Sequence, residues 1–299
     1  MERRRRSDRH AAGHPALRAP ARVVTLRTGS ELLGLEVDGG VATLTLNRPA
    51  ARNALNMEVK AALARVLAEL PRHPEVRALV LTGSGPAFSA GGDVKEFDPS
   101  RTGDQVLARH RWLLQSVYLP LVRLGLPTVA AVNGLAFGAG VSLMLSCDIA
   151  IASEDATFSL AFSRMGLVPD CGALWLLPRA VGPRRARELL LTARRFGAAE
   201  ALELGLVERV VPAGELTGAA AELGAALARG PRGALAMTKR LLEQTGPVGY
   251  AEALEIEAQA VAVAMASAEH AEALDAFLGK RDADFAGLPS VEPVVPAGS

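Results

Sequence analysis

The chain has 299 residues, of which 49% are hydrophobic and 22% charged, so it is long enough to form one large globular core. Its formal net charge of +1 excludes the strongly basic surface that would select nucleic acid. The two cysteines, Cys147 and Cys171, form no close-spaced pair and no cluster with histidine. This pattern argues against a disulfide framework or a zinc site and favours a reducing cytoplasm.

The first thirty residues differ from the rest in charge. Residues 1–30 carry eight arginines against Glu2 and Asp8, a net charge of +6, which leaves −5 for the remaining body. They lack apolar periodicity and contain Pro15 and Pro20, so we expect a disordered tail. An electrostatic contact with an anionic partner is the functional alternative. No apolar stretch follows the arginines, so a secretory signal is not expected.

Strands and helices are predicted to alternate through the next part of the chain. Residues 35–37 and 41–46 flank Asp-Gly-Gly, a hairpin signal, and a helix with Asn56 as its N-cap runs to about residue 70. Further elements are expected at 76–82 (strand), 111–124 (helix, kinked at Pro120), 129–132 (strand), 138–146 (buried helix) and 147–152 (strand). Residues 129–146 are apolar enough to suggest a membrane span, but the turn at 133–134 and Asp148 favour a buried strand, turn and helix.

From about residue 183 the pattern is almost entirely helical. Helices are predicted at 183–192, 198–204, 215–227, 234–244 and, as one long alanine-rich helix, 250–278. The last is apolar all round, so we expect it to be buried on the core or in a neighbouring subunit. The alternation upstream predicts an α/β protein with stacked ββα units and a mixed or parallel sheet. The glycines of "GLAFGAG" do not have the spacing of a dinucleotide or P-loop fingerprint.

Two glycine-rich turns have the same layout. The segments "AFSAGGD" (87–93) and "NGLAFGAG" (133–140) each follow a predicted strand and open a helix. Such turns can present two backbone N–H groups to one oxygen, which is the arrangement of an oxyanion hole. Tight packing of glycine turns is the structural alternative.

Five segments together resemble the crotonase family, the enoyl-CoA hydratase/isomerase superfamily. They are "LNRPAARNALN", "AFSAGGDVKEF", "AAVNGLAFGAGVSLMLSCDIAIASEDATFSL", "GLVPDCGALWLLPRAVG" and "AFLGKRDADF", and the similarity runs from about residue 35 to 285. The resemblance implies a spiral of stacked ββα units, an acyl-CoA thioester as substrate and no metal or redox cofactor. It divides the chain into a tail (1–30), a core with the acyl-CoA site (31–230) and a C-terminal helical region (231–299) used to form a trimer or a dimer of trimers. No membrane partner is implied.

The resemblance also assigns site residues. The family's oxyanion hole falls on the N–H groups of Gly92 and Ala139. Ala90, Asp93 and Lys95 fall on the path of coenzyme A, and Lys280 matches a lysine that reaches the coenzyme A phosphates, often on an adjacent subunit. Surface charge is the alternative for both lysines, although the chain has only four lysines against 29 arginines.

The sequence departs from the family at its two catalytic acids. Ser142 and Phe162 stand where hydratases of the family carry glutamates, and neither side chain can act as a carboxylate base. Asp170 is the remaining acid in the segments that line the site. Members with "VPD" here resemble the branch that contains epoxyphenylacetyl-CoA isomerases, in which this aspartate is the acid/base. The local pattern equally fits a helix N-cap, with apolar neighbours such as Leu167, Val168 and Trp175 around it.

The leading hypothesis is therefore an acyl-CoA isomerase in which Asp170 moves the proton. The alternatives are an enoyl-CoA hydratase, a dehalogenase- or hydrolase-like enzyme with Asp170 as nucleophile, and a degenerate acyl-CoA-binding subunit. His73 and His110 are expected at the surface, and Glu96 and Asp148 in structural roles. The far wall of the acyl pocket is expected to involve Phe97, Trp112 and Tyr118, where the family varies most.

Overall fold

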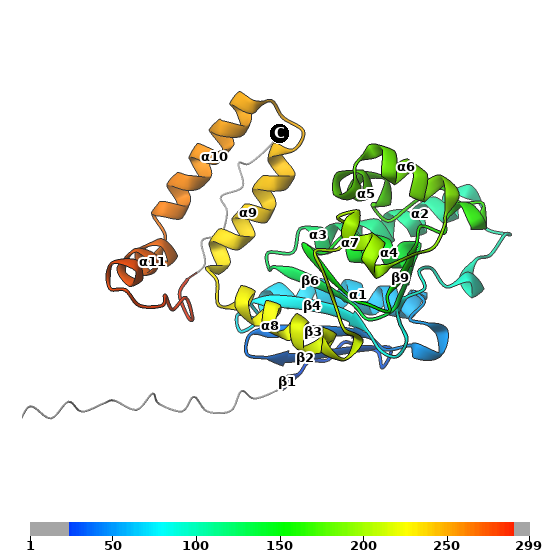
Figure 1. The fold of residues 1–299 in the computed structure, drawn as a ribbon, viewed down its shortest axis with the longest axis horizontal. Coiled ribbons are helices and arrows are strands. Elements are labelled where there is room, and N and C mark those ends of the chain that lie inside the picture. Colours follow the sequence, from blue (N-terminus) through cyan, green and yellow to red (C-terminus); the bar gives the residue numbers. More distant parts are fainter. Residues whose placement is uncertain (1–23, 290–299) are drawn as a thin grey trace, which may run out of the picture.

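A seven-stranded sheet forms the base of the molecule (Figure 1). The computed structural model describes residues 24–289. In the order in which they pair, the strands are β1 (Val24–Thr25), β2 (Leu33–Asp38), β3 (Val41–Leu46), β4 (Ala78–Gly83), β6 (Thr128–Val132), β8 (Ile149–Ser153) and β11 (Arg209–Val211). The predicted hairpin is confirmed, since β2 and β3 pair antiparallel through all six residues of each, and from β3 onward the pairs are parallel.

A smaller sheet lies beside the large one and gives the fold its repeat. It contains β10 (Phe196–Gly197), β9 (Thr157–Ser159), β7 (Leu135–Phe137) and β5 (Ala87–Ser89). Each of β4, β6 and β8 is followed within a few residues by a short strand of this sheet. After β6 and β7 the chain continues directly into helix α4 (Ala139–Leu145). These are the stacked ββα units that the sequence predicts. The units bring the carboxyl end of β5 next to the carboxyl end of β7, which pairs with it in parallel.

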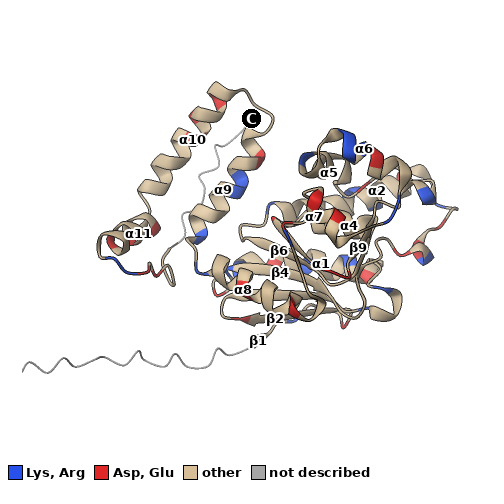
Figure 2. Cartoon of the chain, viewed as in Figure 1, with Lys and Arg blue, Asp and Glu red and all other residues tan. Residues whose placement is uncertain are grey.

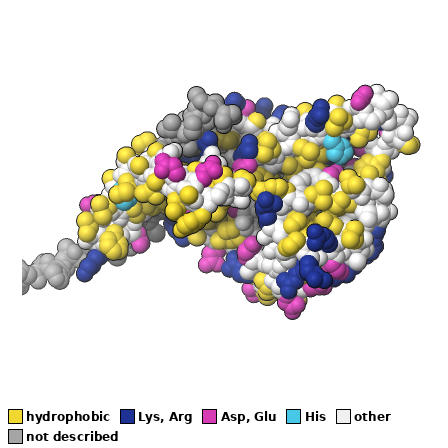
Figure 3. Space-filling view, turned by 90° about the horizontal axis from the view of Figure 1, so that it is seen from above, with side chains coloured by type: hydrophobic (Ala, Val, Ile, Leu, Met, Phe, Trp, Pro, Cys, Tyr) yellow, Lys and Arg dark blue, Asp and Glu magenta, His cyan; other side chains and the backbone are white. Residues whose placement is uncertain are grey.

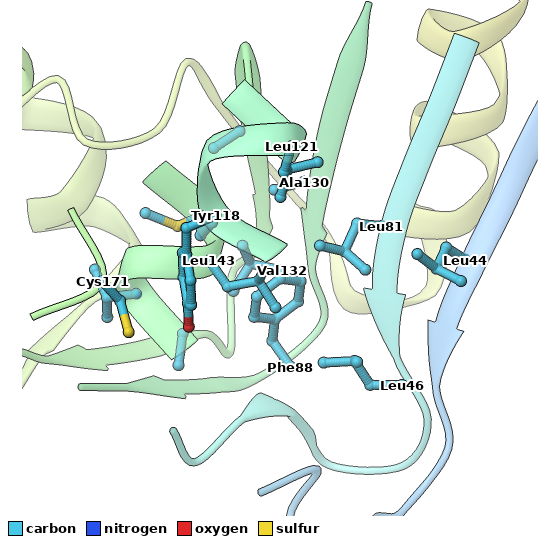
Figure 4. Packing of buried hydrophobic residues seen from close by; sticks show 14 of the residues in the cluster. Leu44, Leu46, Leu81, Phe88, Tyr118, Leu121, Ala130, Val132, Leu143 and Cys171 are labelled. Carbon is cyan, nitrogen blue, oxygen red and sulfur yellow. The ribbon is translucent and has the colours of Figure 1, made fainter. Parts of the chain in front are cut away.

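Helices cover both faces of the large sheet. On one face, α1 (Met57–Glu69), α4 and the small sheet enclose the main core, with Phe88, Leu81 and Leu143 fully buried (Figure 4). On the other, α8 (Leu216–Ala228) packs against Val41 and Val80, and it comes so close that a Cβ on Gly224 would lie 2.9 Å from Val41. Later in the chain the body also contains α5 (Ala173–Val181), α6 (Pro183–Thr192) and α7 (Ala198–Glu203).

The predicted helix at 111–124 differs from the structure in both start and regularity. It begins at Gly103 as α2 (Gly103–Leu113), with a capping box formed by Thr102 and Gln105. It then widens into a π-helical turn, η4 (Leu114–Tyr118), before α3 (Leu119–Val122). Pro120 lacks the N–H that an α-helix would use and its ring crowds the preceding turn, so the wider turn takes the place of the expected kink.

The C-terminal helices form an arm that stands beside the body (Figure 1). They are α9 (Arg232–Thr245), α10 (Tyr250–Met265) and α11 (Ala268–Leu278). The prediction of one helix over 250–278 is wrong, because Ser267 ends it and caps α11 by accepting the N–H of His270.

Two kinds of contact fix the arm. On the body, the ammonium of Lys239 lies 2.7 Å from Asp148, which confirms a structural role for that aspartate. Within the arm, the buried carboxylate of Glu269 on α11 accepts the N–H groups of Gly233 and Ala234 at the start of α9. Because α9 has no side-chain cap of its own, Glu269 supplies one from another helix.

The arm is apolar and uncovered in the single chain. No residue of α10 is buried, so the first of the two expected alternatives, burial on its own core, is wrong, and burial in a neighbouring subunit stays a prediction. The charges of α10 lie in its first half, at Glu252, Glu255 and Glu257, and residues 258–265 carry none (Figure 2). Figure 3 shows hydrophobic side chains spread over the arm and the neighbouring face of the body. The most exposed apolar residues of the arm are Leu242, Tyr250, Met265, Phe277 and Leu278.

Part of the predicted tail lies in the described region. Residues 24–25 form β1, which pairs with β2, so the expected disorder is wrong for this part of 1–30. Residues 1–23 and their arginines lie outside the described residues, as do residues 290–299 of the C-terminal region. Within 24–289, no helix combines the length and apolar character required to cross a bilayer.

Candidate active site

The two glycine-rich turns meet at the carboxyl ends of β5 and β7. Gly91 has a left-handed backbone (φ +86°), and a Cβ at this position would lie 2.5 Å from the carbonyl oxygen of Phe137 and 3.1 Å from the nitrogen of Ala139. A Cβ on Gly140 would lie 2.4 Å from the carbonyl oxygen of Ser89. Only residues without side chains allow the two backbones to come this close, so the glycines place Gly92 and Ala139 at adjoining turns.

The N–H groups of Gly92 and Ala139 are both available there. Ala139 is the first residue of α4, where a helix leaves its N–H groups without internal acceptors. Two backbone hydrogen bonds flank Gly92: the N–H of Leu55 donates to the carbonyl of Gly91, and the N–H of Asp93 donates to the carbonyl of Leu55. The N–H of Gly92 itself has no acceptor among residues 24–289. The ring of Phe97 lies beside it, since a Cβ on Gly92 would be 3.6 Å from that ring. An oxyanion hole needs two such N–H groups at adjoining turns, and the assignment of Gly92 and Ala139 to that role stays a prediction.

Asp170 does not cap the helix that follows it. The helix α5 begins only at Ala173, its N-cap is Gly172, and no side chain caps it. Cys171 and Gly172 have φ angles of +55° and +85°, so the chain turns sharply before the helix starts. The N-cap interpretation is therefore wrong, and the carboxylate of Asp170 is left for another role. A left-handed backbone costs free energy in a non-glycine residue, so contacts from the surrounding structure must hold Cys171 in this conformation.

His110 is the partner that the sequence analysis missed. His110 is exposed, as expected, but its Nε2 also lies 3.1 Å from Oδ2 of Asp170. The other carboxylate oxygen, Oδ1, is buried and has no hydrogen-bond partner in the described part of the chain. His110 lies on α2, sixty positions earlier in sequence, so no local pattern could reveal the pair. One oxygen of Asp170 is thus held while the other is free.

Ser142 has a different task from the glutamate it replaces. It is fully buried on α4, one turn after Ala139, and its hydroxyl donates to the backbone carbonyl of Asp170 at 3.2 Å. Phe162 is also buried and lies against the turn at Gly138. Neither position offers a carboxylate, and Ser142 instead joins the Asp170 loop to helix α4, which begins at Ala139.

The surroundings of Asp170 are only partly those expected from the sequence. Leu167, Val168 and Trp175 are exposed in the single chain, so they do not enclose the carboxylate as expected. On the inner side, Tyr118 is buried, and burial raises the pKa of its hydroxyl well above its usual value, with the neighbouring Cys171 and Asp170 adding to the shift. Burial also raises the pKa of the Cys171 thiol, which therefore stays protonated.

The residues expected along the coenzyme A path fall into two places. Ala90 and Lys95 lie on the rim of the same turn, Lys95 being exposed in the short helix η3 (Val94–Glu96). Asp93 is buried and pairs with Arg48 at 2.5 Å, and the hydrogen bond from Arg48 holds the pKa of Asp93 below its usual value. Lys280 follows α11 on the arm, away from the site of its own chain (Figure 1).

Three further side chains were expected to have a structural role or to line the pocket. Glu96 accepts the N–H of Met57 and so caps α1, which confirms its structural role. Trp112 is only partly buried and packs against the main core, and Phe97 is exposed beside Gly92. In residues 24–289, no group of three or more His, Cys, Asp or Glu side chains is placed to hold a metal ion.

Comparison with known proteins agrees with this architecture. Residues 36–288 match the family model described as "Enoyl-CoA hydratase/isomerase". The chain belongs to the enoyl-CoA hydratase/isomerase family. Its fold is the crotonase fold expected from the sequence, and the crystal structure of an enoyl-CoA hydratase from Mycobacterium smegmatis is similar, with a TM-score of 0.80 and 35% identity over 86% of this chain and 99% of that one.

Members of the family with different names are similar to this chain to a comparable degree. A "1,2-epoxyphenylacetyl-CoA isomerase" from Escherichia coli is 39% identical over 86% of this chain and 99% of its own length. A "Short-chain-enoyl-CoA hydratase" from Clostridium acetobutylicum is 35% identical over 83% of this chain and 94% of its own length. Family membership therefore supports an enzyme acting on acyl-CoA thioesters and does not by itself separate isomerase from hydratase.

Proposed function

We propose that this enoyl-CoA hydratase/isomerase family member is an acyl-CoA isomerase. It shifts a double bond from the β,γ to the α,β position, or rearranges a cyclic or epoxide acyl-CoA, through an enolate. The observation that carries the proposal is the state of Asp170, whose Oδ2 contacts His110 while its buried Oδ1 has no hydrogen-bond partner among residues 24–289. The similarity to an epoxyphenylacetyl-CoA isomerase supports the same choice.

The reaction needs one carboxylate and two N–H groups. The thioester oxygen accepts the N–H groups of Gly92 and Ala139, which stabilise the negative charge that forms on it. Asp170 removes a proton from the α carbon, and the electron pair of that C–H bond passes into the dienolate. The same carboxyl group returns the proton to the γ carbon, and the double bond moves without gain or loss of atoms.

Hydration would require more than the site offers. A hydratase must hold a water molecule, remove its proton and supply a second proton to the substrate. In this chain, Ser142 donates its hydroxyl to a backbone carbonyl and Phe162 has no ionisable group. One carboxylate remains, which is sufficient for a proton shift but not for the two-acid chemistry of hydration.

Paired substrates test the proposal. The enzyme is incubated with a β,γ-unsaturated acyl-CoA and, separately, with its α,β isomer, and both mixtures are separated by chromatography. We expect conversion of the first into the second, no hydroxyacyl product, and loss of conversion in Asp170→Asn. The control is Asp38→Asn, which changes an exposed carboxylate in the β2–β3 hairpin. Rapid hydration of the α,β isomer would favour a hydratase, and tight binding without turnover would favour an acyl-CoA-binding subunit.

The contact between His110 and Asp170 also favours a second candidate, a hydrolytic enzyme. Asp170 would attack a carbon that carries a leaving group, forming an ester while the group departs with its bonding electrons. His110 would take a proton from water, whose oxygen attacks the ester carbonyl. The alcohol then leaves with the His110 proton, and the restored acid loses a proton to solvent. A single turnover in heavy-oxygen water would label Asp170 in this case, and an unlabelled Asp170 peptide would exclude it.

We also propose that the arm packs on other copies of the chain, giving a trimer or a dimer of trimers. Its apolar residues, Phe277 and Leu278 among them, are exposed in the single chain and would be buried in such an assembly. Lys280 on the arm would then reach the coenzyme A phosphates of a neighbour rather than of its own chain. Light scattering should give roughly three or six times the chain mass of 31.2 kDa. A monomer would contradict the proposal.

A further inference from the structure

Tyr118 lies between the two parts of the proposed active site. It is the last residue of the π-helical turn η4, is buried, and donates its hydroxyl to the carbonyl of Ala139 at 3.2 Å. Ala139 is the residue whose N–H is assigned to the oxyanion hole. A π-helical turn inside an α-helix is rare and is found often at functional sites. Here it ends at Tyr118, two residues before Pro120.

The same hydroxyl lies beside the loop that carries Asp170. Figure 4 shows the hydroxyl of Tyr118 next to the sulfur of Cys171, and this thiol and the Asp170 charge both act on the pKa of Tyr118. Cys171 has a left-handed backbone, so its conformation depends on surrounding contacts to be maintained. Tyr118 therefore contacts the oxyanion-hole residue on one side and the strained residue after the acid on the other.

We propose that Tyr118 is a positioning residue that fixes the oxyanion hole and the Asp170 loop relative to each other. The inference rests on the proposed function. By holding the carbonyl of Ala139, Tyr118 limits rotation of that residue and so keeps its N–H directed at the thioester oxygen. By packing against Cys171, it keeps the Asp170 carboxyl at a fixed position relative to the bound thioester.

Tyr118 does not itself transfer a proton. Its hydroxyl is buried, is donated to a backbone carbonyl, and has a raised pKa. Ser142 provides a parallel connection, from the first turn of α4 to the carbonyl of Asp170. Because this Ser142 hydrogen bond remains when the Tyr118 hydroxyl is removed, the loss of that hydroxyl should reduce catalysis without unfolding the site.

The test compares two tyrosine-to-phenylalanine variants. Tyr118→Phe removes the buried hydroxyl, and Tyr250→Phe makes the same change on α10, outside the site, while keeping the ring that the proposed assembly would bury. Each protein is mixed with para-(dimethylamino)cinnamoyl-CoA, whose absorption moves to longer wavelength when its thioester carbonyl is polarised. Titration gives the Kd of this probe, and turnover of the β,γ-unsaturated substrate gives kcat and KM.

We expect Tyr118→Phe to lose most of the wavelength shift and roughly 10-fold in kcat, because a displacement of a fraction of an ångström is enough to weaken such alignment. KM and the Kd of the probe should stay near the wild-type values, and Tyr250→Phe should resemble the wild type. A Tyr118→Phe protein with the full shift and full kcat would overturn the inference while leaving the proposed function intact. A wild-type protein that neither shifts the probe nor turns over substrate would instead contradict the proposed function.

A second variant keeps the test decisive if Tyr118→Phe does not fold. Cys171→Ala removes only the contact with the Asp170 loop and leaves the bond from Tyr118 to Ala139. It should keep the wavelength shift but lower kcat. Wild-type kcat in Cys171→Ala would show that the contact on this side has no effect on catalysis, and the inference would fail.

Discussion

The substitution Gly91→Ala tests whether close packing of the two turns builds the oxyanion hole. Two separate costs apply to it. An alanine at φ +86° costs about 1–2 kcal/mol for its backbone conformation alone. Its methyl group would also lie 2.5 Å from the carbonyl oxygen of Phe137, about 0.5 Å inside the shortest contact that such atoms tolerate. The atoms that the methyl group would meet belong to the backbone of the second turn and cannot rotate away, so one turn must move away from the other.

The movement falls on the residues that hold the thioester oxygen. Gly92 follows Gly91 directly, and the nitrogen of Ala139 would be 3.1 Å from the new methyl group. A shift of 1 Å at a catalytic group costs about 100-fold in rate, so half of that shift should cost about 10-fold or more in kcat. The loss should be in kcat rather than in KM, since the rest of the coenzyme A path is unchanged.

A matched variant separates the two costs. Gly39→Ala introduces the same methyl group at a left-handed glycine (φ +55°) with no atom within 4 Å, far from the site in the β2–β3 hairpin. It should lower the free energy of unfolding by about 1–2 kcal/mol and leave kcat unchanged. Both variants are assayed for isomerisation and for urea unfolding. Equal kcat in the two variants would refute the claim that the Gly91 contact aligns the N–H groups.

Three further substitutions or treatments give clear expectations. His110→Ala should lower kcat about 10-fold by releasing the catalytic carboxylate, whereas His73→Ala, which breaks an exposed histidine–carboxylate pair of equal length, should not change it. Asp93→Asn should lower the free energy of unfolding by about 2 kcal/mol at neutral pH. Because the pKa of Asp93 is lower in the folded state, this stabilisation is present above the unfolded value, and the difference between variant and wild type should fade as urea unfolding is measured below about pH 4. Burial raises the pKa of Cys147 to about 12, so about one thiol in 10,000 is ionised at pH 8 and a disulfide reagent should modify it only after unfolding; rapid reaction of the native protein would contradict this.

The parts of the fold that depend on local pattern could be predicted from the sequence. The hairpin at Asp-Gly-Gly and the cap at Asn56, which accepts the N–H of Val59, both follow from neighbouring residues. The long helix at 250–278 could not be divided correctly, because alanine-rich sequence continues past Ser267 and only the capping bond to His270 marks the break. The π-helical turn was also missed, since Pro120 predicts a disturbance but not its form.

The candidate site was predictable in its residues more than in its contacts. The glycine pattern predicted two similar turns, the family resemblance assigned Gly92 and Ala139 to them, and the loss of both usual acids pointed to Asp170. Its partner His110 could not be found, because the contact joins α2 to a loop sixty positions later. The N-cap interpretation of Asp170 failed for a conformational reason: Cys171 takes a left-handed backbone although it is not glycine, which delays the helix by two residues.

The central claim is that Asp170 carries the proton between two carbons of an acyl-CoA held by Gly92 and Ala139. The most direct measurement is the rate at which deuterium from heavy water enters the α and γ carbons of a β,γ-unsaturated acyl-CoA, followed by NMR. Because the side chain of Asp170 is partly exposed, its carboxyl proton exchanges with solvent before it is returned, so we expect rapid entry with the wild type and with Asp38→Asn, and a rate about 1,000-fold lower with Asp170→Asn. Entry at the wild-type rate with Asp170→Asn would contradict the account.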